Sequence, residues 1–401
     1  MGQWALAIDF GTSFTTVAMS VDGRIVPLEI ANSRYLPSAV AMDAEGTLLT
    51  GPEAVQRGRH EPASAVRLPK RALVAGPKVR LNGRTVATTD LVAAVLERAA
   101  AEARSVQGGD EPGEVVLTHP AAWGDQELAA LRKAAATAGL GTPRLVAEPI
   151  AAAVHYAVGC TATGCADASR IDLPDGGCLA VYDLGGGTFD TAVVRRDGAG
   201  FVLVGEPGGD ASLGGEDLDE RFLEMLEARA VDRDPAAWAE PAAGPAAQHA
   251  RAVLRREVVD AKHVLSRLYT VDLAVPGYPA TFRVTRDEFT GIVDGDLRRS
   301  LDTLTATVAG AGLDPAGLAA VALAGGSSQV PRVAELIAEH FGALPLTAPD
   351  PKSAVVHGAL LSSTAGTAAP SADPAPSADP VPRRRRPPLD PDPEDWMPDI
   401  S

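Results

Sequence analysis

The sequence predicts a mixed α/β protein built from two similar halves, for three reasons. Two distant segments resemble one another: LAIDFGTSFTTVAM, which contains Asp9, and LAVYDLGGGTFDTAVV, which contains Asp183. Each is an apolar, strand-like run that ends in an aspartate, followed by a glycine turn with a hydroxyl side chain and a second β-branched run. At 401 residues the chain is long enough for two or three domains with sizeable cores. It is 46% hydrophobic, rich in alanine and leucine, and only 4% aromatic, which is typical of strands covered by many helices.

The first half is expected to begin with strands and then to alternate strands with helices. Short strands are expected over residues 3–52, followed by a connector rich in proline and basic residues over 62–77. Apolar residues at helical spacing predict a helix near 89–104. Further along we expect a buried strand at EVVLTHPAAW and then a helix that is capped by Asp125 and runs through Ala138. The segment RLVAEPIAAAVHYA is expected to form a short strand, a turn at Glu148-Pro149 and a helix.

The second half is expected to repeat this plan after a surface loop rich in Gly, Asp and Ala over 159–177. We expect, in order, the second hairpin, a helix at 215–230, a Pro/Ala-rich loop near 235–245, a long helix ending near 268, strands at TVDLAV and ATFRVT, a helix near 287–310, the strand AAVALAG, and a helix that Pro331 opens and Gly342 ends. From about residue 366 the chain contains APSADP twice, four arginines and an acidic end. This segment has too little apolar surface to order itself, so we predict a disordered tail, with docking of the arginines to an acidic partner as the less favoured alternative.

Charge and hydropathy exclude several classes of function. A net charge of −16 argues against nucleic acid as the main partner, because binding phosphates of a nucleic acid needs surplus Lys and Arg. The chain does not open with a signal-peptide pattern, because Asp9 interrupts the first apolar run. No uncharged apolar stretch of about 18 residues occurs. We therefore expect a cytoplasmic protein that does not act on membranes.

Three glycine turns at strand ends predict a site for phosphate groups. The glycines at 185–187 would let backbone N–H groups approach an anion, the hydroxyl of Thr188 adds a donor, and Asp9 and Asp183 can each hold a hydrated metal ion. A third turn, Gly325-Gly326, would present backbone donors at the start of a helix. Any one of these turns can be purely structural. All three together, in this order, predict a clamp around a metal-bound nucleotide.

These motifs resemble the nucleotide-binding domain of the seventy-kilodalton heat-shock chaperones, the Hsp70 or DnaK-type family. The resemblance covers roughly residues 3–363 in the family's order, and DLGGGTFD separates the chain from actin and from sugar kinases. It implies the actin-like ATPase fold, in which two ribonuclease-H-like lobes surround a nucleotide cleft. The implied divisions are lobe I at 1–180, lobe II at 181–350, a C-terminal helix at 351–366 that returns to lobe I, and the disordered Pro/Ala/Arg-rich tail at 367–401. The matching stretches are AIDFGTSFTTVA, PKRAL, VVLTHPAAW, LVAEPIAAAVHYA, LAVYDLGGGTFDTAVV, SLGGEDLDERF, DAKHVLS, VALAGGSSQVPRV and DPKSAVVHGAL.

The resemblance also implies roles for individual residues. Asp9 and Asp183 would hold the waters of a magnesium ion that bridges the outer phosphates. Glu148 would orient the attacking water, and Lys70 would neutralise charge on the transferred phosphoryl group; an alignment that places Val66 at the lysine position remains open. The implied catalytic residues are Lys70, Glu148, Asp183 and Thr188. The implied nucleotide-binding residues are Gly11, Thr12, Ser13, Gly185, Gly186, Gly187, Thr188, Gly214, Gly215, Glu216, Lys262, Ser266, Gly325, Gly326 and Ser327.

The chain departs from the family's pattern in two respects. On the adenosine side, the family's glutamate, two arginines and aspartate are replaced by Val259, His263, Gln329 and Lys352, so we expect weaker adenosine affinity or a shifted base preference. In the family a leucine-rich linker leads to a peptide-binding domain, whereas here GALLSSTAG runs into the proline repeats. We therefore expect no peptide-binding domain and no complete chaperone cycle from this chain alone.

The favoured function is ATP binding with slow magnesium-dependent hydrolysis to ADP and phosphate. Closure of the lobes around ATP would act as a switch that a protein partner reads. One alternative is an adenine-nucleotide-responsive scaffold with negligible hydrolysis. Another is a phosphotransferase of the sugar-kinase type, for which no segment offers a distinct general-base aspartate. The client, the oligomeric state and the role of the tail are left open.

Overall fold

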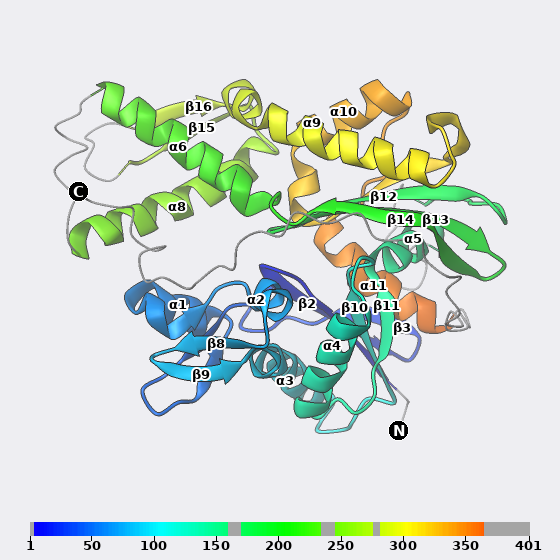
Figure 1. Ribbon diagram of the computed structural model, residues 1–401, viewed down its shortest axis with the longest axis horizontal. Helices are drawn as coiled ribbons and strands as arrows, with labels where there is room; N and C mark the ends of the chain where they lie inside the picture. Colours follow the sequence, from blue (N-terminus) through cyan, green and yellow to red (C-terminus); the bar gives the residue numbers. More distant parts are fainter. Residues whose placement is uncertain (1–3, 159–169, 234–244, 276–280, 365–401) are drawn as a thin grey trace.

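Two mixed sheets of similar design form the centre of the molecule (Figure 1). The computed structural model describes residues 4–158, 170–233, 245–275 and 281–364. The first sheet has the strand order β11 (Arg144–Ala147), β10 (Glu114–His119), β1 (Ala5–Phe10), β2 (Phe14–Val21) and β3 (Arg24–Pro27), with β4 (Leu36–Pro37) beside β2. The second has the order β14 (Gly200–Asp210), β13 (Phe189–Asp197), β12 (Cys178–Leu184) and β17 (Ala320–Ala324).

The pairing within the two sheets shows the duplication that the sequence predicts. In the first sheet β1 runs antiparallel to β2 and parallel to β10, and in the second β12 runs antiparallel to β13 and parallel to β17. Asp9 pairs across its hairpin with Thr16, and Asp183 pairs with Asp190. Both aspartates therefore lie at the same end of equivalent hairpins, next to the glycine turns.

Smaller sheets and helices complete each half of the chain (Figure 1). The small sheets are β6 (Leu48–Thr50), β5 (Val40–Met42) and β7 (Ala65–Val66); β8 (Lys78–Leu81) and β9 (Arg84–Ala87); and β15 (Thr270–Leu273) and β16 (Phe282–Thr285). The helices are α1 (Pro52–His60), α2 (Pro69–Ala75), α3 (Thr88–Val106), α4 (Asp125–Thr137), α5 (Glu148–Val158), α6 (Gly215–Arg233), α8 (Pro245–Leu265), α9 (Arg286–Gly310), α10 (Pro331–Phe341) and α11 (Pro351–Thr364). The predicted mixed α/β class is confirmed. None of the helices in the described ranges is apolar over a length that would span a bilayer.

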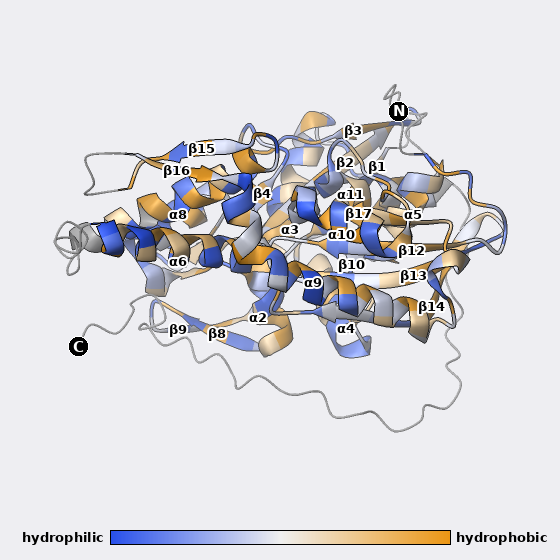
Figure 2. Ribbon diagram, turned by 90° about the horizontal axis from the view of Figure 1, so that it is seen from above, coloured by the Kyte–Doolittle hydropathy of each residue, from blue (hydrophilic) through white to orange (hydrophobic). Residues whose placement is uncertain are grey.

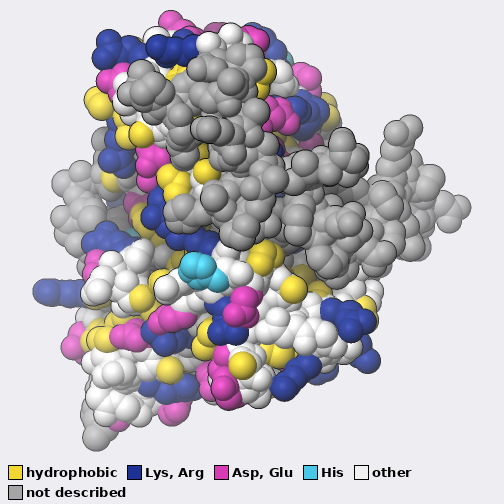
Figure 3. All heavy atoms as spheres, turned by 90° about the vertical axis from the view of Figure 1, so that its left-hand side faces the viewer, with side chains coloured by type: hydrophobic (Ala, Val, Ile, Leu, Met, Phe, Trp, Pro, Cys, Tyr) yellow, Lys and Arg dark blue, Asp and Glu magenta, His cyan; other side chains and the backbone are white. Residues whose placement is uncertain are grey.

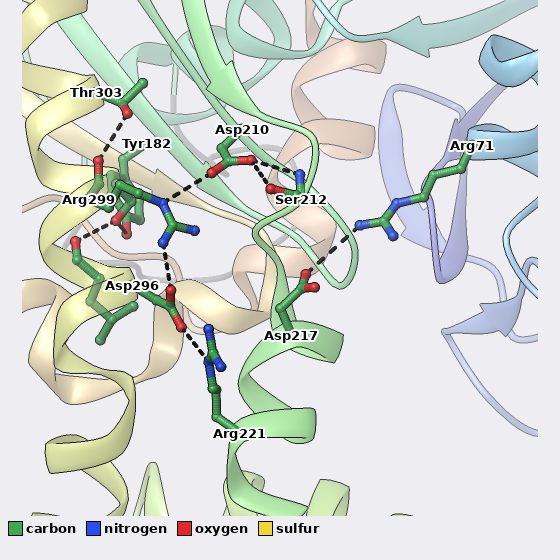
Figure 4. Close-up of polar contacts among 11 residues, drawn as sticks. Arg71, Tyr182, Asp210, Ser212, Asp217, Arg221, Asp296, Arg299 and Thr303 are labelled. Carbon is green, nitrogen blue, oxygen red and sulfur yellow. Dashed lines mark hydrogen bonds and ion pairs between the residues drawn. The ribbon is translucent and has the colours of Figure 1, made fainter. Parts of the chain in front are cut away.

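Helix α9 shows how local sequence and long-range charge pairing position one helix. Its start is a capping box in which the Thr285 hydroxyl accepts from the Glu288 amide at 3.1 Å and the Glu288 carboxylate accepts from the Thr285 amide at 2.7 Å. Hydrophilic and hydrophobic residues alternate along α9, as expected for a helix with one buried face (Figure 2). Its buried Asp296 accepts from Arg221 of α6 and from Arg299, which also reaches Asp210 at the end of β14 (Figure 4). These contacts fix α9 against α6 and the second sheet.

Three details differ from the sequence predictions. The segment at 62–77 is not a plain connector, because it contains β7 and α2; Pro69 starts α2, since its fixed φ suits the first helical turn. Gly124, not Asp125, precedes α4, and its amide donates to the Glu127 carboxylate at 3.0 Å. No turn separates β11 from α5, because the helix begins at Glu148 itself. The predicted lobe bounds stay predictions, and the predicted tail and parts of the predicted loops lie outside the described residues.

Helices α5 and α11 lie between the two large sheets and share one hydrophobic cluster with both of them. This cluster contains Ala7 and Ala18 of the first sheet, residues 151–154 of α5, Ala322 and Ala324 of the second sheet, and residues 354–356 of α11. Small side chains allow the helices to approach closely: a Cβ added at Gly358 of α11 would lie 1.8 Å from the carbonyl oxygen of Ala151 in α5. The Tyr156 hydroxyl of α5 also donates to the Leu323 carbonyl of β17 at 2.5 Å. The α5–α11 pair therefore connects the two sheets through tight backbone packing.

This packing predicts that Gly358→Ala destabilises the protein. The added methyl group would collide with helix backbone, which cannot move as a side-chain tip can, so we expect a loss of about 1–3 kcal/mol of unfolding free energy. Gly291→Ala is the matched control, because a Cβ there would meet no described atom within 4 Å; alanine in a helix should stabilise it by about 0.4–1 kcal/mol. Thermal and urea unfolding measure both variants. Equal stability of the two variants would contradict the close approach.

Candidate functional site

A cavity of about 560 Å³ lies between the two halves of the molecule, which is the size range of small-molecule sites. The first sheet and its helices supply one wall, and the second sheet with α6, α8 and α11 supplies the other. Residues predicted from the sequence are brought together here. Those that line the cavity are Asp9, Gly11, Thr12, Ser13, Lys70, Glu148, Asp183, Gly185, Gly186, Thr188, Gly215, Glu216, Lys262, Gly325, Gly326 and Ser327.

Three predicted residues do not line the cavity. The Gly187 carbonyl accepts a hydrogen bond from Arg71 of α2. A Cβ added at Gly214 would lie 2.5 Å from the carbonyl carbon of Gly187, so Gly214 supports the glycine turn from behind. The Ser266 hydroxyl donates to the carbonyl of Lys262 at 3.0 Å, which turns it back onto its own chain. Gly187 and Gly214 thus shape the turn, and Ser266 does not reach the cavity wall.

The two glycine turns face one another across the cavity. The Gly185 amide donates to the Thr188 carbonyl at 2.9 Å and closes the turn of the second hairpin. A Cβ at Gly186 would lie 2.4 Å from Oγ of Ser13, which belongs to the first hairpin. Ser13 Oγ in turn donates to Glu216 of α6 at 3.1 Å. A side chain at Gly186 would therefore separate the turns, and glycine allows the contact.

Four carboxylates gather at the inner end of the cavity around one lysine; that of Glu148 is buried, and those of the three aspartates are half-buried. This acid cluster consists of Asp9, Glu148, Asp183 and Asp190, and Lys70 Nζ lies 2.7 Å from Glu148 Oε1. Burial and the Glu148 charge raise the pKa of Asp9 to about 6 and that of Asp190 to about 6. The same two causes raise the pKa of Asp183 well above its ordinary value. One ammonium cannot compensate four carboxylates, so the cluster favours a further cation or bound protons.

Hydrogen bonds fix the orientation of two members of the acid cluster. Thr118 Oγ1 donates to Asp9 Oδ1 at 2.6 Å, and Thr188 Oγ1 donates to Asp190 Oδ2 at 2.9 Å. Asp190 was missing from the residues predicted for the site. It is the last residue of DLGGGTFD, and its pairing with Asp183 across the hairpin was the signal that could have found it.

Lys70, and not Val66, reaches the acid cluster. Val66 lies in β7 and packs against the core of the first half, away from the cavity wall. Lys70 projects from the first turn of α2, where its ammonium also lies 5.6 Å from the centre of the Trp123 ring. Burial alone would lower the pKa of Lys70, but Glu148 and Asp9 raise it by more, so the side chain stays charged.

The donor set fits magnesium held through water. Poorly compensated carboxylates attract a hard divalent cation, and magnesium keeps several waters while it bridges carboxylates to phosphates. Within the described ranges, no group of three or more His, Cys, Asp or Glu side chains is arranged to hold a metal directly. Coordination by Asp9 and Asp183 through water, and the magnesium ion itself, stay predictions.

The outer part of the cavity is more basic. Lys262 of α8 is buried, with Nζ 2.7 Å from both the Gly215 carbonyl and Asp219 Oδ1. Of the four positions that depart from the family, Val259, His263 and Lys352 line the cavity, whereas Gln329 is exposed outside it. Burial and the charge of Lys352 lower the pKa of His263 to about 4, so this histidine is neutral at pH 7.

Arginines mark the mouth of the cavity on the side of α1 and α8, where Figure 3 shows Lys and Arg side chains gathering between the lobes. Those that line the cavity are Arg59, Arg67, Arg255 and Arg256. Closer to the glycine turns, pairs of opposite charge connect the two halves: Arg71 of α2 lies 3.9 Å from Asp217 of α6 (Figure 4), and Arg67 lies 3.6 Å from Glu216.

Comparison with known proteins agrees with this geometry. The family described as "Hsp70 protein" matches residues 73–371. The chaperone protein HscA of Pectobacterium carotovorum is 30% identical over 384 residues, which cover 90% of this chain and 58% of that protein. An HscA homolog of Pseudomonas fluorescens is 31% identical over 385 residues, 90% of this chain and 57% of that protein. The chain thus spans less than two thirds of the length of these relatives.

The raised pKa values of the acid cluster predict that Asp183→Asn stabilises the ligand-free protein, and more so at higher pH. The folded protein binds more protons than the unfolded chain between about pH 4 and 6, so the stability contributed by the cluster falls as the pH rises through that window. Removing one carboxylate relieves this repulsion. We expect a melting temperature higher by roughly 2–4 °C at pH 7.5, the shift that about 1 kcal/mol produces in a domain of roughly 150–250 residues, and a smaller gain at pH 5.

Asp110→Asn is the matched control, because Asp110 is exposed. It should leave the melting temperature unchanged at both pH values. A gain for Asp183→Asn that is equal at pH 5 and pH 7.5 would contradict the raised pKa.

Proposed function

The chain belongs to the Hsp70 family, which has the actin-like ATPase fold, and from this premise we propose that it binds ATP with magnesium and hydrolyses it slowly. The observation that supports this best is the buried ion pair of Lys70 and Glu148, 2.7 Å apart, beside Asp9 and Asp183. A lysine next to a glutamate, at the end of a cavity lined by glycine turns, suits phosphoryl transfer to water. The proposed products are ADP and phosphate.

Residues of the acid cluster and their direct neighbours have separate roles in the proposed hydrolysis. Glu148 would accept a hydrogen bond from the attacking water, and its ion pair with Lys70 fixes the orientation of the carboxylate. The ammonium of Lys70 would stabilise charge that develops on the outer phosphate. The Thr188 hydroxyl donates a hydrogen bond to Asp190, so its oxygen lone pairs can accept a hydrogen bond from that water. When bound, magnesium would neutralise phosphate charge, with Asp9 and Asp183 holding its waters.

Closure of the lobes is the proposed output. The glycine turns of the two hairpins belong to different halves, so a phosphate bound between them would draw the halves together. Arg71 already joins the two halves through the Gly187 carbonyl and Asp217. A protein partner would read the open or closed state. We include a chaperone-related role in this proposal because the relatives are named chaperones. It stays a proposal because the chain spans under two thirds of their length. A location in the cytoplasm stays a prediction.

Hydrolysis predicts that Glu148→Gln and Lys70→Met each slow phosphate release from bound ATP by roughly 100-fold or more, because each removes a group that acts on the transferred phosphoryl group. Single-turnover release of phosphate with magnesium measures this. Lys78→Met is the matched control, because Lys78 is exposed on β8, and its rate should equal that of the wild type. Tight ATP binding without release by the wild type would favour the nucleotide-responsive scaffold. Turnover only in the presence of sugar would favour a phosphotransferase.

The contacts between the lobes predict that Arg71→Ala speeds nucleotide release. The substitution removes the hydrogen bond to Gly187 and the ion pair with Asp217, which both connect the two halves across the cavity. We expect the dissociation rate of ADP to rise roughly three- to tenfold, as the loss of about 0.7–1.4 kcal/mol implies. Stopped-flow displacement of a fluorescent ADP analogue gives this rate. Arg80→Ala on the exposed face of β8 should not change it, and an unchanged rate in Arg71→Ala would show that Arg71 does not hold the lobes together.

A further inference from the structure

Lys352 is a half-buried cation in the wall of the cavity. It is the second residue of α11, and its side chain crosses the backbone of Gly326, since a Cβ at Gly326 would lie 2.3 Å from Cε of Lys352. Its Nζ lies 5.3 Å from the ring centre of Phe14 and 4.6 Å from that of Tyr35. Aromatic faces stabilise an ammonium group, but they give it no hydrogen-bond acceptor with a full charge.

No acidic side chain in the described residues lies within 4.0 Å of the Lys352 ammonium. Burial lowers the pKa of Lys352, and the nearby charges that act on it are Asp350, which raises the pKa, and Lys262, which lowers it. Asp350 accepts a hydrogen bond from the Ser353 hydroxyl at 2.5 Å. The ammonium of Lys262 is already engaged with Asp219 and the Gly215 carbonyl. Lys352 therefore has donors to offer to a ligand in the cavity, while Lys262 has a protein partner.

The position of Lys352 identifies the part of the ligand that it can reach. Gly325 packs against the acid cluster, because a Cβ there would lie 2.4 Å from Asp183 Oδ1. Gly326, the next residue, packs against Lys352. Lys70, by contrast, lies among the carboxylates of the acid cluster, which do not contribute to the pKa of Lys352. Among the cations that line the cavity, Lys70 thus lies at the inner end and Lys352 lies farther out along the Gly325-Gly326 turn.

We propose that Lys352 binds the phosphate group nearest to the ribose of the nucleotide. This inference rests on the proposed function, in which the outer phosphates lie at Lys70 and Glu148. A nucleotide with its terminal phosphate there passes Gly325 and Gly326 before its ribose, and the phosphate at that point meets the Lys352 ammonium. A phosphate oxygen carries the charge that the aromatic rings of Phe14 and Tyr35 lack, and it forms a charge-assisted hydrogen bond with an ammonium group.

Binding of AMP, ADP and GDP to the wild type, Lys352→Met and Lys352→Arg tests the proposal. Each affinity is measured by displacement of a labelled ADP from the full chain in the presence of magnesium. We expect Lys352→Met to lower all three affinities by the same factor of roughly tenfold or more, the loss of one hydrogen bond between charged groups. Lys352→Arg keeps the charge and the contact with the rings, so it should bind within a few-fold of the wild type. Lys78→Met controls for the loss of one positive charge from the surface.

Each other outcome overturns the proposal in a distinct way. Unchanged ADP affinity in Lys352→Met would show that the ammonium does not touch the nucleotide. A change in the ratio of ADP to GDP affinity would place Lys352 on the base. A loss for ADP and GDP but not for AMP would place it on an outer phosphate. Failure of the wild type to bind ADP would instead overturn the proposed function, and the melting temperatures of the variants show whether they fold.

Discussion

Charge repulsion within the acid cluster links the fold to ligand binding. Asp9 is the last residue but one of β1, Asp183 lies on β12, and Glu148 begins α5. The cluster can therefore form only when both sheets and the helix between them are in place. Its carboxylates share one buried ammonium, that of Lys70, and burial together with the Glu148 charge raises the pKa of Asp9 and of Asp183. In the proposed function, a bound cation with phosphates would remove this penalty and stabilise the folded state, because it would bind only where both halves supply their residues. The proposed ligand binding and the association of the two halves would therefore be coupled.

The helices that connect the sheets also start at the cavity. Glu148 is the first residue of α5, and Lys352 is the second of α11, so both helices direct their N-termini, with their partial positive charge, toward the proposed phosphate path. Deeper in the protein the same helices cross at Gly358 and Ala151 with almost no free space. A shift of α11 against α5 would therefore change the distance between Glu148 and Lys352. The alanine-rich crossing holds both ends of the proposed nucleotide site in register.

Sequence reasoning found the parts of the site that depend on local structure. The DLGGGTFD hairpin was recognised because an apolar strand, a glycine turn and a second strand are adjacent in the chain, and α10 was bounded well because Pro331 and Gly342 mark its ends. The misjudged parts depend on distant partners. The segment around Lys70 looked like a basic connector, since its ion pair with Glu148 joins residues 78 positions apart. Lys352 looked only like a lost aspartate, because its contacts with Phe14, Tyr35 and Gly326 come from folding of the whole chain.

Opposite charges face one another near the glycine turns and like charges at the mouth, and in the proposed function this pattern would set the balance between open and closed states. Near the turns, Arg71 faces Asp217 across the two halves, and opposite charges favour closure. At the mouth, Arg59 of α1 and Arg256 of α8 both line the cavity, and within the described residues neither has an acidic side chain within 4.0 Å. Burial and the charge of Arg256 lower the pKa of Arg59, so closure brings like charges together there. Because both side chains are exposed, salt screens this repulsion within a Debye length of about 8–10 Å. Opposite charges should thus favour approach of the two halves near the glycine turns, and like charges should oppose it at the mouth. Binding of phosphates would then determine whether the cavity closes.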